Sequence, residues 1–324
     1  MRFLREIQGL DEEHLRKKVS SKIKRLEAQS LKENPDYQVL GYQVEDIPQL
    51  YQLERTGNES YISLTMRCFY NNFIPKNTKI VFGLVYNRLG RAGSFGKSYY
   101  LDDQEYLYDF CKYIQEIDIE DEVELFGYIR DFLKKYFGYF QVLDRDQMLT
   151  MLMDINGNPF PINNTHSIKN FKGKGNALCS EYAVMAQNIL RLFGFESYLV
   201  LGTEKVNDNN PEGHAYNLIT YKDSETKTTR HAVLDFMNPV SVYDHDYHKI
   251  GEEPFIGYID KLDEEVVNEL IHGDKHLVFD DYGYCIFGNS LLKLGFNRTR
   301  NYYVDTYIHP DTKKSDNKVY TLTK

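Results

Sequence analysis

The stretch from Gly173 to Pro239 reads GKGNALCSEYAVMAQNILRLFGFESYLVLGTEKVNDNNPEGHAYNLITYKDSETKTTRHAVLDFMNP. Cys179 opens an apolar pattern within it. The pattern continues at the helical period through Tyr182, Ala183, Ala186, Leu190 and Phe193. Gly194 follows, and glycine is the residue that most often ends a helix. The sequence therefore predicts a helix whose first turn carries Cys179.

Three candidate strands follow this helix. Residues 196–202 (ESYLVLG) have the composition of a buried strand, whereas residues 214–221 (HAYNLITY) and 230–236 (RHAVLDF) alternate between two faces. A short polar segment separates the last two, which is typical of an antiparallel hairpin. Because neighbouring strands lie side by side, we expect His214 and Asp235 to come within bonding distance.

Cys179, His214 and Asp235 form a candidate catalytic triad. The dipole and free N–H groups of a helix N-terminus favour a thiolate, and the same N–H groups can stabilise an oxyanion. His214 would take the proton from Cys179, and Asp235 would orient the imidazole. The alternative is that Cys179 is an inert core residue, which is the more common state of a cysteine on a helical face.

These segments resemble the transglutaminase-like superfamily, whose core fold is similar to that of papain-like cysteine proteases. The resemblance is carried by C-S-E-Y-A-x-x-A-Q-N-x-L-R-x-x-G-F from Cys179, a strand that closes at Gly202, H-A-Y-N from His214 and V-L-D ending at Asp235. It covers residues 170–240. It implies that Cys179 is the nucleophile, His214 the base and Asp235 the orienting residue.

The stretch departs from the family pattern near the triad. Tyr216 stands where the family often has Trp, and Ala177 stands where Gly is common. The residues after Asp235 are Phe-Met-Asn-Pro. The family often has an Asp-Pro pair here with a Thr or Ser shortly after it, and this sequence lacks that pattern. These differences concern the substrate class more than the triad.

Further residues are candidates for supporting roles at this site. Asn176, Asn163 and Asn164 are candidate side-chain donors to an oxyanion. Tyr216 and His231 are candidates for contact with the triad. The long polar loop within residues 144–175 leads directly to Cys179, so we expect it to form one wall of the site.

The resemblance implies a cysteine-dependent acyl-transfer enzyme that cleaves or exchanges an amide or peptide bond through a thioester on Cys179. Water as acceptor makes it a hydrolase or peptidase, and an amine makes it a cross-linking transglutaminase. Hydrolysis is favoured, because the sequence gives no sign of a dry amine tunnel. The implied partner is a peptide or protein substrate, and no cofactor is implied. A deamidating transglutaminase and a non-catalytic transglutaminase-like scaffold remain alternatives.

The composition of the chain is that of a globular protein and argues against several other classes. The chain has 324 residues, of which 42% are hydrophobic and 27% charged, so it can bury a sizeable core. Its net charge of −9 argues against nucleic acid as a partner. The first residues lack the apolar core of a signal peptide, and no apolar run reaches the roughly 18 residues of a membrane span. Four widely spaced cysteines indicate reduced thiols, so we expect a cytoplasmic protein.

We expect an α+β fold with a helical N-terminal extension and a β-rich C-terminal part. The predicted division is 1–100, an amphipathic helix with a small α/β region, and 101–324, the transglutaminase-like domain. Residues 10–33 form the amphipathic helix, which either docks on the body or serves a partner or self-association. Residues 103–116 and 121–137 predict two further helices with core-facing stripes.

Two other sequence patterns are weaker evidence for a binding site. Residues 88–98 (RLGRAGSFGKS) end like a phosphate-binding loop, but the first glycine is misplaced and no helix pattern follows. His245 and His248, like His272 and His276, have the spacing of paired metal ligands but lack a third ligand. We therefore expect neither a nucleotide nor a metal site.

Overall fold

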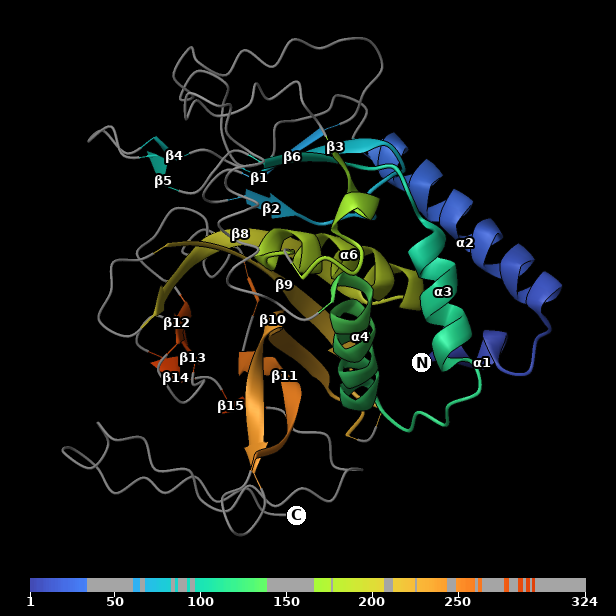
Figure 1. Ribbon diagram of the computed structural model, residues 1–324. Coiled ribbons are helices and arrows are strands. Elements are labelled where there is room, and N and C mark those ends of the chain that lie inside the picture. Colours follow the sequence, from blue (N-terminus) through green and yellow to red (C-terminus); the bar gives the residue numbers. More distant parts are fainter. Residues whose placement is uncertain are drawn as a thin grey trace.

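A computed structural model describes the parts of the chain that position the candidate triad. The described residues are 1–33, 61–64, 68–82, 85–86, 92–93, 97–138, 166–175, 177–206, 212–224, 226–243, 249–259, 262–263, 277–279, 285–287, 290–291 and 293–294. They form an α+β structure in which helices cover a largely antiparallel sheet (Figure 1).

Four long strands make the centre of the main sheet. They are β8 (Glu196–Val206), β9 (Glu212–Lys222), β10 (Thr229–Tyr243) and β11 (Lys249–Ile259), and each is antiparallel to the next. The predicted hairpin is therefore confirmed, with Val233 of β10 opposite Leu218 of β9. All three predicted strands of this region are longer than their patterns indicated, because pairing extends them into the polar segments.

Shorter strands extend the main sheet at its edges. Along β8, β2 (Cys68–Tyr70) pairs antiparallel and β12 (Leu277–Phe279) pairs parallel. Beyond β12 lie β13 (Cys285–Phe287) and β14 (Ser290–Leu291), and β15 (Lys293–Leu294) pairs with β11.

A second, smaller sheet has the order β1-β3-β6-β7. Its strands are β1 (Tyr61–Leu64), β3 (Thr78–Phe82), β6 (Lys97–Leu101) and β7 (His166–Ser167), and β4 (Val85–Tyr86) pairs separately with β5 (Ala92–Gly93). A 3-10 turn, η3 (Ile168–Phe171), follows β7 and leads toward the segment before Cys179.

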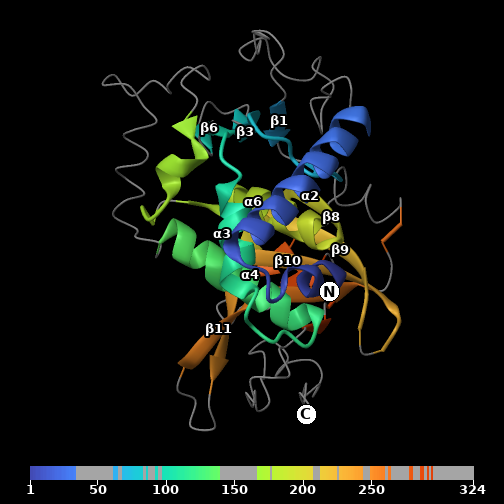
Figure 2. The ribbon, with the colours of Figure 1, turned by 90° about the vertical axis from the view of Figure 1, so that its right-hand side faces the viewer.

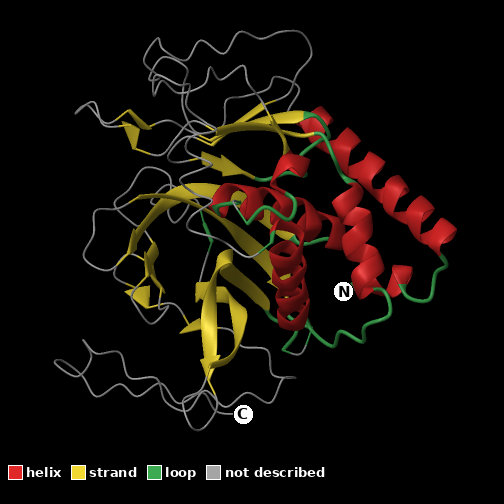
Figure 3. Ribbon diagram, in the orientation of Figure 1, coloured by secondary structure: helices red, strands yellow, loops and turns green. Residues whose placement is uncertain are grey.

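The helices form a layer on one side of the main sheet, as Figure 2 and the colouring of Figure 3 show. They are α1 (Arg2–Ile7), α2 (Glu12–Glu33), α3 (Glu105–Ile114), α4 (Glu122–Phe137) and α6 (Cys179–Phe193). Of these, α6 packs on strands β8, β9 and β10, and α4 contacts both α6 and the sheet. The helix that carries Cys179 is thus enclosed between the other helices and the strands (Figure 1).

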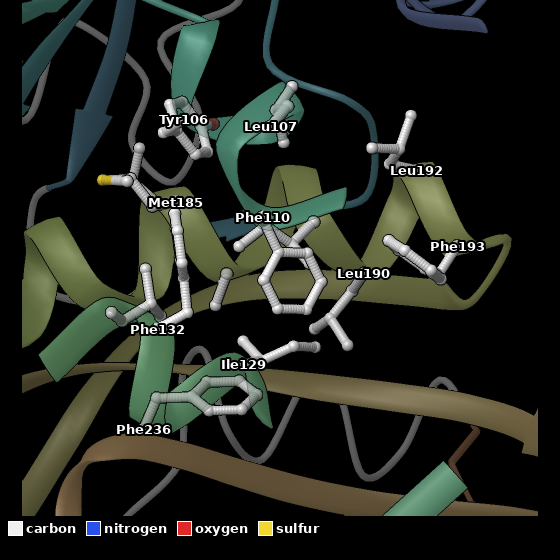
Figure 4. Packing of buried hydrophobic residues seen from close by; sticks show 14 of the residues in the cluster. Tyr106, Leu107, Phe110, Ile129, Phe132, Met185, Leu190, Leu192, Phe193 and Phe236 are labelled. Carbon is white, nitrogen blue, oxygen red and sulfur yellow. The ribbon is translucent and has the colours of Figure 1, made fainter. Parts of the chain in front are cut away.

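Aromatic side chains fill the space between these layers. Phe193 at the end of α6 makes edge-to-face contacts with Phe3, at a centroid distance of 5.4 Å, and with Phe110, at 5.6 Å. Figure 4 shows Phe110 beside Leu190 and Phe193, with Ile129 and Phe236 below. These contacts join α1, α3, α4, α6 and the sheet in one hydrophobic core. Burial of such apolar surface is the main force that holds the layers together.

The predicted N-terminal helix docks on the body. Its apolar residues Leu15, Val19 and Ile23 are buried in the common core. A short helix that the sequence had not predicted, α1, precedes it and buries Phe3 and Ile7. The apolar residues of α2 are already buried against the rest of the protein. The predicted binding of a partner, or self-association, through residues 10–33 would therefore have to use the polar face of this helix. The division at residue 100 stays a prediction.

Buried amides tie α6 to the segment before β3. Asn188 is 0% exposed, and its side chain accepts the N–H of Ile74 at 2.7 Å and donates to the Ile74 carbonyl at 2.9 Å. Gln187 donates to the carbonyls of Asn72 and Ser197 at 3.0 and 2.9 Å. Backbone groups beside α6 gain hydrogen-bond partners in this way, which burial requires.

The other expectations have mixed outcomes. Residues 103–116 and 121–137 form α3 and α4, with Phe110 and Leu133 buried as predicted. Gly194 ends α6 in the left-handed conformation, and the Phe195 N–H reaches the Leu190 carbonyl at 3.0 Å. Three expected features lie wholly or mostly outside the described residues: both histidine pairs, the loop 88–98 and the loop within residues 144–175.

The segment that leads to Cys179 is fastened to the end of α4. The N–H groups of Gly173 and Gly175 donate to the carbonyls of Tyr136 and Phe137, both at 2.8 Å. Gly138 has φ 84° and ψ 168°, a conformation that is almost restricted to glycine. A Cβ added there would lie 3.2 Å from the carbonyl carbon of Gly173. Glycine at 138 therefore allows the close approach of the two segments.

Substitution of Gly138 by Ala should lower the free energy of unfolding by about 3 kcal/mol, because backbone strain and a steric clash act together. Denaturation in guanidinium chloride measures this. Gly9→Ala is the matched control, because Gly9 has φ 69° but nothing within 4 Å of an added Cβ. That variant should lose only about 1 kcal/mol. Equal losses would contradict the close approach at Gly138.

Candidate active site

Cys179 is the first residue of α6 and is 9% exposed. The residue before it, Leu178, has extended backbone angles and makes no side-chain cap. Leu has no side-chain acceptor, so it leaves the backbone N–H groups of the first turn directed out of the helix end. The predicted placement of the thiol at a helix start is therefore confirmed.

His214 and Asp235 are bonded to each other inside the protein. His214 Nε2 lies 2.6 Å from Asp235 Oδ2, and the two residues are 2% and 1% exposed. His214 lies near the beginning of β9, opposite Gly202 of β8. The pairing of β10 with β9 ends at Leu234, immediately before Asp235. The predicted contact between the two strands is confirmed.

A backbone contact holds the carboxylate of Asp235 in place. Its Oδ1 accepts the N–H of Met237 at 2.9 Å, while Oδ2 faces His214. The pairing of β10 with β11 is irregular between Asp235 and Pro239. Both oxygens of the carboxylate therefore have a donor, as a buried charge requires.

Cys179 also lies close enough to the ring of His214 for its side chain to help raise the pKa of the imidazole. Because Nε2 faces Asp235, Nδ1 is the ring nitrogen left to exchange a proton with the thiol. The structure thus brings together Cys179, His214 and Asp235, as the sequence predicted.

The surroundings favour the protonated form of His214. Burial by itself would lower the pKa of the imidazole, but the charge and hydrogen bond of Asp235, together with Cys179, outweigh it. The pKa of His214 is therefore raised well above its ordinary value of 6.5. A positive imidazolium beside Cys179 is the partner that stabilises a thiolate.

The supporting residues fall into three groups. Tyr216 is 1% exposed, and its ring stacks near that of His214 at a centroid distance of 6.2 Å. His231 lies opposite Thr220 on β9, and its Nδ1 is 2.8 Å from the Thr220 hydroxyl. Since Thr220 is six positions beyond His214, about 20 Å along the strand, the structure does not bring His231 to the triad. Asn163, Asn164 and Asn176 lie outside the described residues.

Two contacts at the site were not predicted. One is the hydrogen bond from the Met237 N–H to Asp235. The sequence could have indicated it, because an aspartate side chain often accepts the N–H two residues later. The other is the side chain of Glu181, whose Oε2 accepts the Leu178 N–H at 2.7 Å. Its signal was a glutamate in the third position of the helix, the place it takes in a capping box.

Other classes of site receive no support in the described residues. No group of three or more His, Cys, Asp and Glu side chains is placed there to hold a metal ion. No helix in those ranges is both long and apolar enough to cross a membrane.

Comparison of the chain with models of known protein families, with curated proteins and with solved structures finds no match. The chemical interpretation therefore depends on the geometry alone.

Replacement of Asp235 by Asn should lower the pKa of His214, because an amide has no charge to oppose the cost of burying an imidazolium. NMR titration of the imidazole measures this, and the wild-type ring should stay protonated at pH 7. Because the pKa of His214 is higher in the folded protein than in the unfolded chain, its protonation stabilises the fold. This contribution is complete below about pH 6.5 and is lost as the pH rises through the pKa of the folded protein. The two proteins should therefore differ most in unfolding free energy at low pH. Identical titration curves would contradict the charge coupling.

Proposed function

We propose that this protein is a cysteine-dependent acyl-transfer enzyme with a transglutaminase-like core. The observation that carries the proposal is the buried 2.6 Å contact between His214 Nε2 and Asp235 Oδ2, with Cys179 near the same imidazole. The order of the three residues in the chain supports it further, as does the position of Cys179 at the start of a helix packed on antiparallel strands.

In the first half of the reaction, the thiolate of Cys179 attacks the carbonyl carbon of an amide. The carbonyl π electrons move to oxygen, and N–H groups of the first turn of α6 would stabilise that negative charge. As the C–N bond breaks, the imidazolium of His214 gives a proton to the departing amine. The products are an amine and a thioester on Cys179.

In the second half, neutral His214 takes a proton from water or from an amine as either attacks the thioester. The C–S bond breaks and the thiolate returns, so the imidazolium–thiolate pair is restored. Water completes hydrolysis or deamidation, whereas an amine completes cross-linking. We favour hydrolysis. Asp235 orients the ring in both halves and stabilises its positive charge.

A non-catalytic scaffold with the same core is the rival function. The observation that favours it is the low exposure of the triad, with Cys179 at 9% and His214 at 2%. A substrate needs access to the sulfur atom, whereas a binding protein does not. The reactivity of the thiol distinguishes the two.

Cys179 should react with iodoacetamide at neutral pH faster than a buried thiol that has no base beside it, because His214 can take its proton. Peptide mapping of the labelled native protein measures the rate. Cys111 is an internal control, since it is fully buried and burial raises the pKa of its thiol.

The variant His214→Ala should lower the rate at Cys179 by at least tenfold at neutral pH, because the cation that stabilises the thiolate is removed. A Cys179 that labels no faster than Cys111, or a rate unchanged by His214→Ala, would support the scaffold instead.

A further inference from the structure

A buried carboxylate lies two residues after Cys179. Glu181 is 0% exposed, and its Oε2 accepts the backbone N–H of Leu178 at 2.7 Å. Leu178 is the residue from which α6 begins, and Cys179 follows it directly. The hydrogen bond therefore closes the first helical turn around the backbone that carries the thiol.

This first turn of α6 has only one of the two hydrogen bonds of a capping box. In a capping box, a Ser or Thr at the N-cap accepts an N–H from the third helical residue, while a Glu there returns the bond. Leu178 has no side-chain oxygen, so only the contribution of Glu181 is made. The carboxylate of Glu181 is therefore the side chain that holds the Leu178 N–H at the start of the helix.

The charges around this carboxylate are also buried. Arg130 of α4 is 4% exposed. Burial raises the pKa of Tyr182 to about 12. The positive charge of Arg130 lowers this pKa, and the negative charge of Glu181 raises it. The two opposite charges therefore both lie near this ring.

A buried carboxylate is costly unless it is bonded and balanced, and its negative charge also disfavours a nearby thiolate. Glu181 therefore does not increase the reactivity of Cys179 through its charge. Its hydrogen bond to Leu178 is what it can contribute to the site.

We propose that Glu181 is a positioning residue for the nucleophile, which holds the Leu178–Cys179 backbone so that the sulfur of Cys179 meets the ring of His214. This inference rests on the proposed function. Two substitutions separate the hydrogen bond from the charge. Glu181→Gln keeps an oxygen that can accept the Leu178 N–H, whereas Glu181→Ala loses both. Glu13→Gln, at an exposed position on α2, removes the same charge far along the chain.

The experiment measures the rate of Cys179 alkylation by iodoacetamide as a function of pH, together with hydrogen exchange at the Leu178 amide. In Glu181→Ala the amide should exchange faster, and the alkylation rate should fall roughly 10-fold to 100-fold at all pH values, since the nucleophile is misplaced. In Glu181→Gln the amide should stay protected. Its alkylation rate should stay near that of the wild type, because the acceptor that positions the backbone is kept. Glu13→Gln should match the wild type.

The possible failures are distinguishable. A slow, unselective Cys179 in the wild-type protein overturns both the enzyme and the role of Glu181. A reactive wild-type thiol whose alkylation rate falls as much in Glu181→Gln as in Glu181→Ala, or whose rate and amide exchange are unchanged in Glu181→Ala, overturns only the role of Glu181. Circular dichroism shows whether each variant is folded. If Glu181→Ala does not fold, Glu181→Met, which fills a similar space without an oxygen acceptor, decides in its place.

Discussion

The enclosure of α6 is the constraint on which the rest of the structure depends. Every residue of this helix except Arg191 is buried, so its polar side chains have to find partners inside the protein. Glu181, Gln187 and Asn188 do so with backbone groups of three segments, which are the turn at Leu178, residues 72–74 and Ser197 of β8. Apolar burial holds the helix in the core, and these polar contacts fix its rotation and its position along its own axis.

A helix held in this way presents its first residue at a defined place. At one end, Asn188 fastens α6 to Ile74, and at the other end Glu181 closes the turn that carries Cys179. Asn217 of β9 donates to the carbonyl of Ala183, which ties the same helix to the strand that bears His214. A nucleophile and a base on separate elements then keep their geometry without rearrangement, which is how a preorganised site lowers an activation barrier.

Strand pairing supplies the second part of that geometry. A shift of one residue in the pairing of β9 would move His214 to the opposite face of the sheet. The long antiparallel contacts of β9 with β8 and β10 oppose such a shift. Where the pairing of β10 with β11 becomes irregular after Asp235, the Met237 N–H holds the carboxylate toward His214.

The sequence by itself determined the local features: the helix that begins at Cys179 and stops at Gly194, the alternation of 214–221, and the hairpin that joins it to Asp235. These follow from periodicity and from the conformational preferences of single residues, which act over a few positions. Only the tertiary structure decided that the His214 ring meets Cys179 and that His231 lies far from the triad. Such contacts depend on how a helix lies across a sheet and on which strand residues face each other. No local pattern encodes either of these.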